Sequence, residues 1–111
     1  MKAIHLDSSN FDSTLAGTEL PVLVDFHAEW CGPCKMLGPI VEQVAEAKDG
    51  EAVVAKVDID AARDLAMRYR ISSVPTVIVF KGGQPVVGAR GVQTRAALEA
   101  MIAEANAKAT A

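Results

Sequence analysis

Short apolar runs, several of them alternating with polar residues, recur along the chain between segments rich in Gly, Pro, Asp and Ser. Such runs are typical of β-strands. They predict five strands, at residues 3–6, 22–26, 52–59 and 76–80 and from Val86 towards Gly91. The run 22–26 is apolar on both faces except at Asp25, which indicates a central strand covered on both sides.

Between these runs, apolar residues return every three or four positions, which is the spacing of a helix with one buried face. Four helices are predicted: one around Phe11–Leu15 closed by Gly17, one from Cys31 to Asp49-Gly50, one that Asp60 caps and that includes 62–69, and one over 97–105. Residues 106–111 are predicted to be a frayed tail.

The predicted order of elements is β-α-β-α-β-α-β-β-α, without repeats or a linker between domains. Helices alternate with strands and then flank a hairpin, so the economical architecture is an α/β fold with a mixed sheet covered on both faces. A chain of 111 residues is expected to form one domain, spanning 1–111.

Composition narrows the function classes. Half of the residues are apolar and 23% are charged, as in a soluble globular protein. The net charge is −3 and the basic residues are scattered, so a nucleic-acid partner is not expected.

No apolar run has the length of a membrane span or of a signal-peptide core, so a cytoplasmic location without membrane contact is expected. Two cysteines exclude a disulfide scaffold and fit a reducing compartment.

Both cysteines fall at one strand-to-helix junction. Cys31 is expected at the helix N-terminus, where free backbone N–H groups and the helix dipole favour a thiolate. Cys34 lies one turn further on, Gly32 permits a tight turn, and Pro33 suits the first helical turn. The alternatives are a zinc half-site or two inert thiols. Zinc needs four ligands and the two histidines lie at no recognised ligand spacing, so redox chemistry is favoured and no metal is expected.

Asp25 is the second unusual position, because a carboxylate between Val24 and Phe26 in a central strand is costly to bury. It is either half of a buried ion pair with Lys56 on the neighbouring strand or a catalytic group. Perturbed titratable groups gather at reactive sites, which favours the catalytic role.

The segment Trp30-Cys31-Gly32-Pro33-Cys34-Lys35 resembles the active-site signature of the thioredoxin family, and the spacing of the whole chain is similar to that family. The resemblance implies the thioredoxin fold, a central five-stranded mixed sheet flanked by four helices. It also implies a monomeric protein-disulfide reductase that acts on disulfide-containing target proteins. Cys31 is then the nucleophile and Cys34 the resolving thiol. No cofactor is expected on the chain, and electrons are expected from NADPH through a separate flavoprotein reductase.

The resemblance also assigns roles to other positions. Asp25 corresponds to the family's buried aspartate, which accepts the proton of Cys34, and Lys56 to the lysine that tunes it. Lys35 is expected to be a solvated charge that helps to bias the thiolate. The residues implied in target binding are Trp30, Ile59, Val74, Pro75 with a cis peptide bond, Gly91 and Val92. Of these, Val74 is expected to pair its backbone with an extended target segment, as an added strand would.

Three residues depart from the family pattern. His27 stands where a large aromatic or apolar residue is common, Ser73 replaces a frequent glycine, and Arg90 replaces an apolar residue. His27 is expected to be partly buried with a satisfied hydrogen bond rather than to act in the redox step. The changes at Ser73 and Arg90 are expected to affect the choice of substrate. Two alternative functions stay open. One is an oxidase or isomerase of the same fold, and the other is a binding module without turnover.

Overall fold

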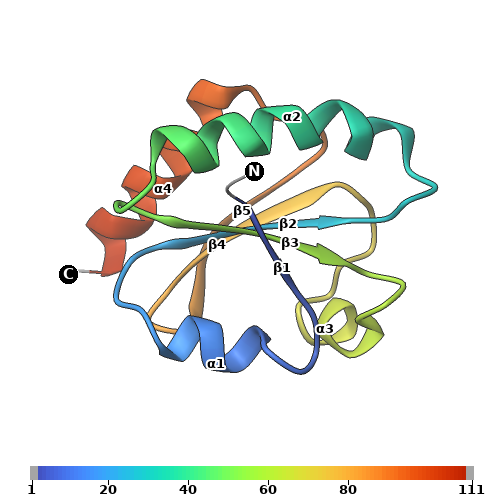
Figure 1. The fold of residues 1–111 in the computed structure, drawn as a ribbon, viewed down its shortest axis with the longest axis horizontal. Helices are drawn as coiled ribbons and strands as arrows, with labels where there is room; N and C mark the ends of the chain where they lie inside the picture. Colours follow the sequence, from blue (N-terminus) through green and yellow to red (C-terminus); the bar gives the residue numbers. More distant parts are fainter. Residues whose placement is uncertain (1–2, 110–111) are drawn as a thin grey trace.

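A five-stranded mixed sheet forms the centre of the computed structural model, which describes residues 3–109 (Figure 1). Its strands are β1 (Ile4–Leu6), β2 (Val22–His27), β3 (Val53–Asp58), β4 (Thr76–Lys81) and β5 (Gln84–Arg90), in the spatial order β1-β3-β2-β4-β5. β3 runs parallel to both β1 and β2, whereas β4 is antiparallel to β2 and to β5. The sheet predicted from the sequence is therefore confirmed, with β2 at its centre.

Helices cover both faces of this sheet (Figure 1). They are α1 (Phe11–Ala16), α2 (Gly32–Ala47), α3 (Arg63–Arg68) and α4 (Arg95–Ala109). The core between the sheet and α2 and α4 includes Leu23, Leu37 and Leu98. The core on the α1 and α3 side includes Phe11, Phe26 and Leu65. This is the α/β architecture with four helices that the pattern predicts.

Alternation along β2 decides what reaches each face. Val22, Val24 and Phe26 join the α1 and α3 core, whereas Leu23 joins the α2 and α4 core. Because strand side chains alternate, Asp25 and His27 share the face of Leu23, under α2. β2 then leads directly through Ala28–Trp30 to the start of α2. The central strand thus carries polar side chains to the helix end that holds the cysteines.

Two predictions about element ends are wrong. The predicted frayed tail 106–111 is helical as far as Ala109, and residues 110 and 111 lie outside the described residues. Alanine and lysine favour helix, Lys108 pairs with Glu104 at 2.6 Å, and Lys81 Nζ donates to Asn106 Oδ1 at 3.1 Å. The predicted cap Asp60 lies outside α3, whose N-cap residue is Ala62 without a side-chain cap bond.

The hairpin between β4 and β5 is tighter than predicted. Its turn consists of Gly82 and Gly83, with φ of 61° and 78°. Two consecutive positive φ angles characterise the two-residue turns that match the twist of paired strands. β5 therefore begins at Gln84, two residues before the predicted start.

In the described part of the chain, the helices are too short or too polar to cross a membrane.

Candidate redox site

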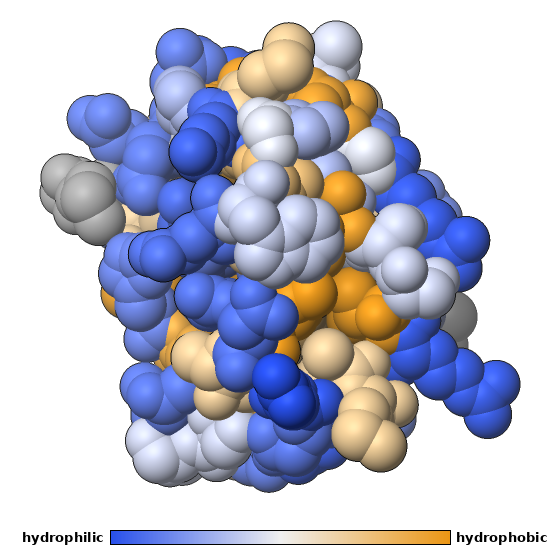
Figure 2. All heavy atoms as spheres, turned by 90° about the vertical axis from the view of Figure 1, so that its right-hand side faces the viewer, coloured by the Kyte–Doolittle hydropathy of each residue, from blue (hydrophilic) through white to orange (hydrophobic). Residues whose placement is uncertain are grey.

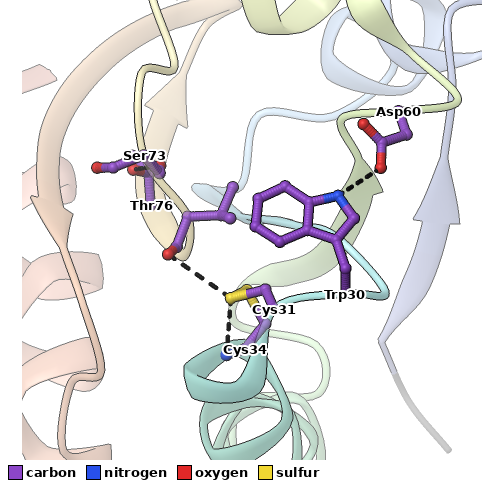
Figure 3. The surroundings of a disulfide bond; sticks show 7 residues. Trp30, Cys31, Cys34, Asp60, Ser73 and Thr76 are labelled. Carbon is purple, nitrogen blue, oxygen red and sulfur yellow. Dashed lines mark hydrogen bonds between the residues drawn. A yellow bond between two sulfur atoms is a disulfide. The ribbon is translucent and has the colours of Figure 1, made fainter.

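Cys31 and Cys34 form a disulfide at the N-terminus of α2 (Figure 3). Their Cα atoms are 5.3 Å apart. Cys31 is the N-cap residue of the helix, and its Sγ accepts a hydrogen bond from the Cys34 backbone N–H at 3.2 Å. Pro33 lies in the first helical turn, as the sequence predicts. The two sulfurs are thus close enough to bond without any change in the fold.

The start of α2 favours negative charge on Cys31. The unpaired N–H groups of a helix N-terminus and its dipole stabilise an anion there. The first turn of α2 carries no acidic residue, and Lys35 is exposed in the same turn. Once the disulfide opens, such a helix end favours the thiolate form of a sulfur at the N-cap.

The sulfur pair lies just beneath the surface. Cys31 and Cys34 are 4% and 6% exposed and pack with Ala28, against the partly buried Ile59 and Val74. Trp30 beside them is 69% exposed. Its indole Nε1 donates to Asp60 Oδ2 at 2.8 Å, so the exposed ring is anchored at one edge (Figure 3).

The loop before β4, which contains Val74 and Pro75, lies beside the cysteines. The Val74–Pro75 peptide bond is cis, as the family resemblance implies. Val74 O lies 3.6 Å from Cys31 Sγ (Figure 3). Gly91 N–H donates to Pro75 O at 2.8 Å, and its φ is 86°. The fold therefore brings the loops before β4 and after β5 to the disulfide.

The family resemblance implies six residues in target binding, and we call this set the docking patch. It consists of Trp30, Ile59, Val74, Pro75, Gly91 and Val92. Trp30 and Val92 are the most exposed large apolar members, at 69% and 41%. Figure 2 shows hydrophobic residues grouped at the centre of this end of the molecule, with hydrophilic residues around them. Exposed apolar surface of this kind is typical of a binding site.

Asp25 is fully buried below the site. Neither of its carboxylate oxygens has a hydrogen-bond partner among the described residues. It lies opposite Lys56 in the register of β2 and β3, but no ion pair within 4.0 Å joins the two in residues 3–109. Burial raises the pKa of Asp25 to about 6, and the positive charge of Lys56 opposes this rise. The alternative of a plain buried ion pair is therefore wrong.

A cavity of about 720 Å³ lies between Lys56 of β3 and the first turns of α2, where Cys34 lines it. Gly38 also lines it. Lys56 Nζ reaches α2, because a Cβ built on Gly38 would lie 3.7 Å from it. Lys56 is thus close both to the strand that carries Asp25 and to the helix turn after Cys34.

His27 lines the same cavity, and its Nε2 is buried without a hydrogen-bond partner in the described residues. Burial lowers the pKa of His27, and the nearby charge of Lys56 lowers it further. The sequence-based expectation of a satisfied histidine is therefore wrong for this nitrogen.

The sequence reasoning missed Asp60 as part of the site. A usable signal exists, because β2 and β3 are parallel and their carboxyl ends meet at one edge of the sheet. Trp30 follows β2 and Asp60 follows β3, so their side chains are expected at that edge. Nothing in residues 3–109 forms a metal-binding group of three or more His, Cys, Asp or Glu side chains.

A disulfide at the start of a helix, on a mixed sheet of this topology, is the arrangement that the resemblance to the thioredoxin family implies. The profile of the family described as Thioredoxin matches residues 2–104. The chain therefore belongs to the thioredoxin family.

Individual relatives agree with this assignment. Mitochondrial thioredoxin of Bos taurus is 47% identical over 96 residues, which is 86% of this chain and 58% of that protein. The bifunctional thioredoxin reductase/thioredoxin of Mycobacterium leprae is 41% identical over 95 residues, 86% of this chain and 21% of that protein. The crystal structure of chloroplastic thioredoxin z is 31% identical with a TM-score of 0.86, covering 96% of each chain. The chain thus spans 58% of the length of its mitochondrial relative.

Proposed function

We propose that the protein reduces disulfides in a broad set of target proteins. The observation that carries this proposal is the Cys31–Cys34 disulfide, placed at a helix N-terminus next to an exposed apolar patch. The helix end supplies a reactive thiolate, and the patch supplies a surface for a protein rather than for a small molecule.

In the proposed reaction, the Cys31 thiolate attacks one sulfur of the target disulfide and forms a mixed disulfide. The other target sulfur leaves as a thiolate and takes up a proton. Cys34 then loses its proton and attacks the Cys31 sulfur, which releases the second target thiolate. Two electrons pass to the target, and the Cys31–Cys34 disulfide remains.

Asp25 is proposed to accept the proton of Cys34. Its pKa of about 6 leaves it mostly ionised at neutral pH, so it is able to take up a proton there. The fully buried carboxylate gains by neutralisation, because burial penalises its charge. Lys56 is proposed to hold this pKa down, in keeping with its opposing charge effect on Asp25.

The docking patch is proposed to hold the target backbone. An extended segment laid beside Val74 would pair with its main chain as an added strand does. The proximity of Val74 O to Cys31 Sγ supports this placement, because a paired segment then passes directly over the nucleophile.

Recycling requires a reductant. We propose NADPH as the electron source, through a separate flavoprotein thioredoxin reductase. The name of the Mycobacterium leprae relative, which joins thioredoxin reductase and thioredoxin in one chain, supports such a pairing. A monomeric state and a cytoplasmic location stay predictions, and a related thioredoxin is mitochondrial.

Reduction of insulin in the presence of dithiothreitol tests the proposal, with turbidity as the readout. We expect wild-type protein to accelerate precipitation and the Cys31→Ser/Cys34→Ser double variant to give only the uncatalysed rate. The Cys34→Ser variant alone is expected to accumulate a mixed disulfide with its target. Equal rates for the wild type and the double variant would contradict a reductase and favour a binding module.

A further inference from the structure

A groove of about 430 Å³ opens between the segment that follows α3 and the neighbouring strands β4 and β5. Its floor includes Ile78 of β4 and Tyr69. Two arginines line it, Arg70 from the segment after α3 and Arg90 from the end of β5. The groove therefore combines an apolar floor with two cations that come from distant parts of the sequence.

Both arginines are exposed, and neither forms an ion pair within 4.0 Å in the described part of the chain. No acidic residue lines the groove. Elsewhere on the surface, Arg68 pairs with Asp12 at 2.7 Å and Arg95 with Glu99 at 2.8 Å. On a chain with a net charge of −3, the groove is thus a local site of uncompensated positive charge.

The position of Arg70 is unusual for its residue type. It directly follows the C-cap residue Tyr69 of α3 and has a φ of 55°. Helix ends with this conformation usually carry glycine, which adopts positive φ without a steric penalty. The turn itself therefore does not require an arginine, and the side chain is the feature left to explain.

The groove adjoins the docking patch. Arg90 directly precedes Gly91, whose N–H donates to Pro75 O. Arg90 also lies opposite Thr76 in the β4–β5 register, and Thr76 is two residues after Val74. A target segment that pairs with Val74 would therefore reach the arginines within about three residues of extended chain.

We propose that Arg70 and Arg90 form an anion-recognition groove that selects target proteins with an aspartate or glutamate about three residues from the reactive cysteine. The inference rests on the proposed function, because it concerns which disulfides Cys31 attacks. A guanidinium group matches a carboxylate in charge and in the geometry of its paired N–H donors. Since both arginines are exposed, the preference is moderate and is screened by salt.

Peptides that carry a single disulfide test this directly, with a Glu, Gln or Lys residue placed at successive positions on either side of the cysteine. For wild-type protein at low ionic strength, we expect kcat/KM for the best Glu position to exceed that of the Gln peptide by about three- to tenfold. The Lys peptide is expected to be the poorest substrate. Added salt is expected to reduce these differences.

Charge reversal locates the effect. Arg90→Glu and Arg70→Glu are each expected to abolish or invert the preference, while reduction of the Gln peptide stays within about twofold of wild type. Arg63→Glu is the matched control, because Arg63 is exposed, has no ion pair within 4.0 Å in residues 3–109 and does not line the groove. It makes the same change in net charge and is expected to keep the preference.

Equal kcat/KM for Glu, Gln and Lys peptides would overturn the inference while leaving the proposed reductase function intact. An equal loss of preference in Arg63→Glu and Arg90→Glu would also overturn it, because the effect would then come from overall charge. If wild-type protein reduces none of the peptides and no insulin, both the inference and the proposed function fail.

Discussion

Asp25 shows, at the scale of a single residue, what a buried carboxylate costs in stability. Its pKa rises from 3.8 to about 6 because burial disfavours the carboxylate. The folded chain thus binds this proton more tightly than the unfolded chain does. The stabilising contribution is complete below pH 3.8 and is lost as the pH rises to about 6.

The Asp25→Asn variant has no carboxylate to ionise, so it does not lose this stability as the pH rises. At pH 7 we expect the variant to have a free energy of unfolding about 2 kcal/mol higher than wild type, from a shift worth about 3 kcal/mol less the burial of the amide. At pH 4 the difference is expected to shrink towards zero. Urea denaturation of the oxidised proteins at both pH values measures it. If the two proteins differed equally in free energy of unfolding at pH 7 and at pH 4, the raised pKa of Asp25 would be contradicted.

His27 gives a second prediction at this scale. Its Nε2 is buried without a protein partner, and such a group costs about 1–3 kcal/mol. His27→Phe keeps a ring under α2 and removes the unsatisfied nitrogen. We expect the free energy of unfolding at pH 7 to rise by about 1 kcal/mol. A clear decrease in urea denaturation would show that the nitrogen makes a favourable interaction in the cavity.

At the scale of the elements, the start of α2 and the two loops that face it build the site from separate parts of the sequence. The strands and helices were predictable from clear local patterns, because β2 is a short apolar run interrupted only at Asp25 and α2 repeats apolar residues at helical spacing. The end of α4 was not, since its last two turns carry mostly small and polar residues without a clear apolar repeat, and the contact of Asn106 with Lys81 joins segments far apart in the sequence. The contact between Trp30 and Asp60 joins the loops that follow two different strands. It can be predicted only when the order of the strands in the sheet is known.

Gly91 gives the prediction at this scale. Its φ of 86° is unfavourable for any other residue, although a Cβ there would meet no atom within 4 Å. We therefore expect Gly91→Ala to lower the free energy of unfolding by about 1–2 kcal/mol through the backbone alone. Gly32→Ala is the matched control, with equally open space and no positive φ. Thermal denaturation measures the stability of both variants. If both lost the same stability, the positive φ of Gly91 would not be the cause.

At the scale of the whole molecule, hydrophobic residues are grouped at the centre of the end that holds the disulfide, and hydrophilic residues surround them (Figure 2). We expect this arrangement to separate the exchange reaction from the recognition of targets. The sulfurs alone are expected to be enough for exchange with a small disulfide, whereas a protein target is proposed to contact the docking patch as well.

Trp30→Ala tests this separation. An exposed tryptophan at the centre of an interface often contributes about 2 kcal/mol or more to binding. We expect kcat/KM for insulin reduction to fall about tenfold or more, with the rate of exchange with oxidised glutathione changed less than about twofold. Equal losses for both substrates would assign Trp30 to the chemistry instead.

The proposed reduction of targets requires Cys31 to be a thiolate at neutral pH, and the N-terminus of α2 is expected to make it one. Absorbance of the thiolate near 240 nm, followed through a pH titration of the Cys34→Ser variant, measures this directly. We expect a pKa for Cys31 about one unit or more below the ordinary value of about 8.5. A pKa at or above that value would contradict it.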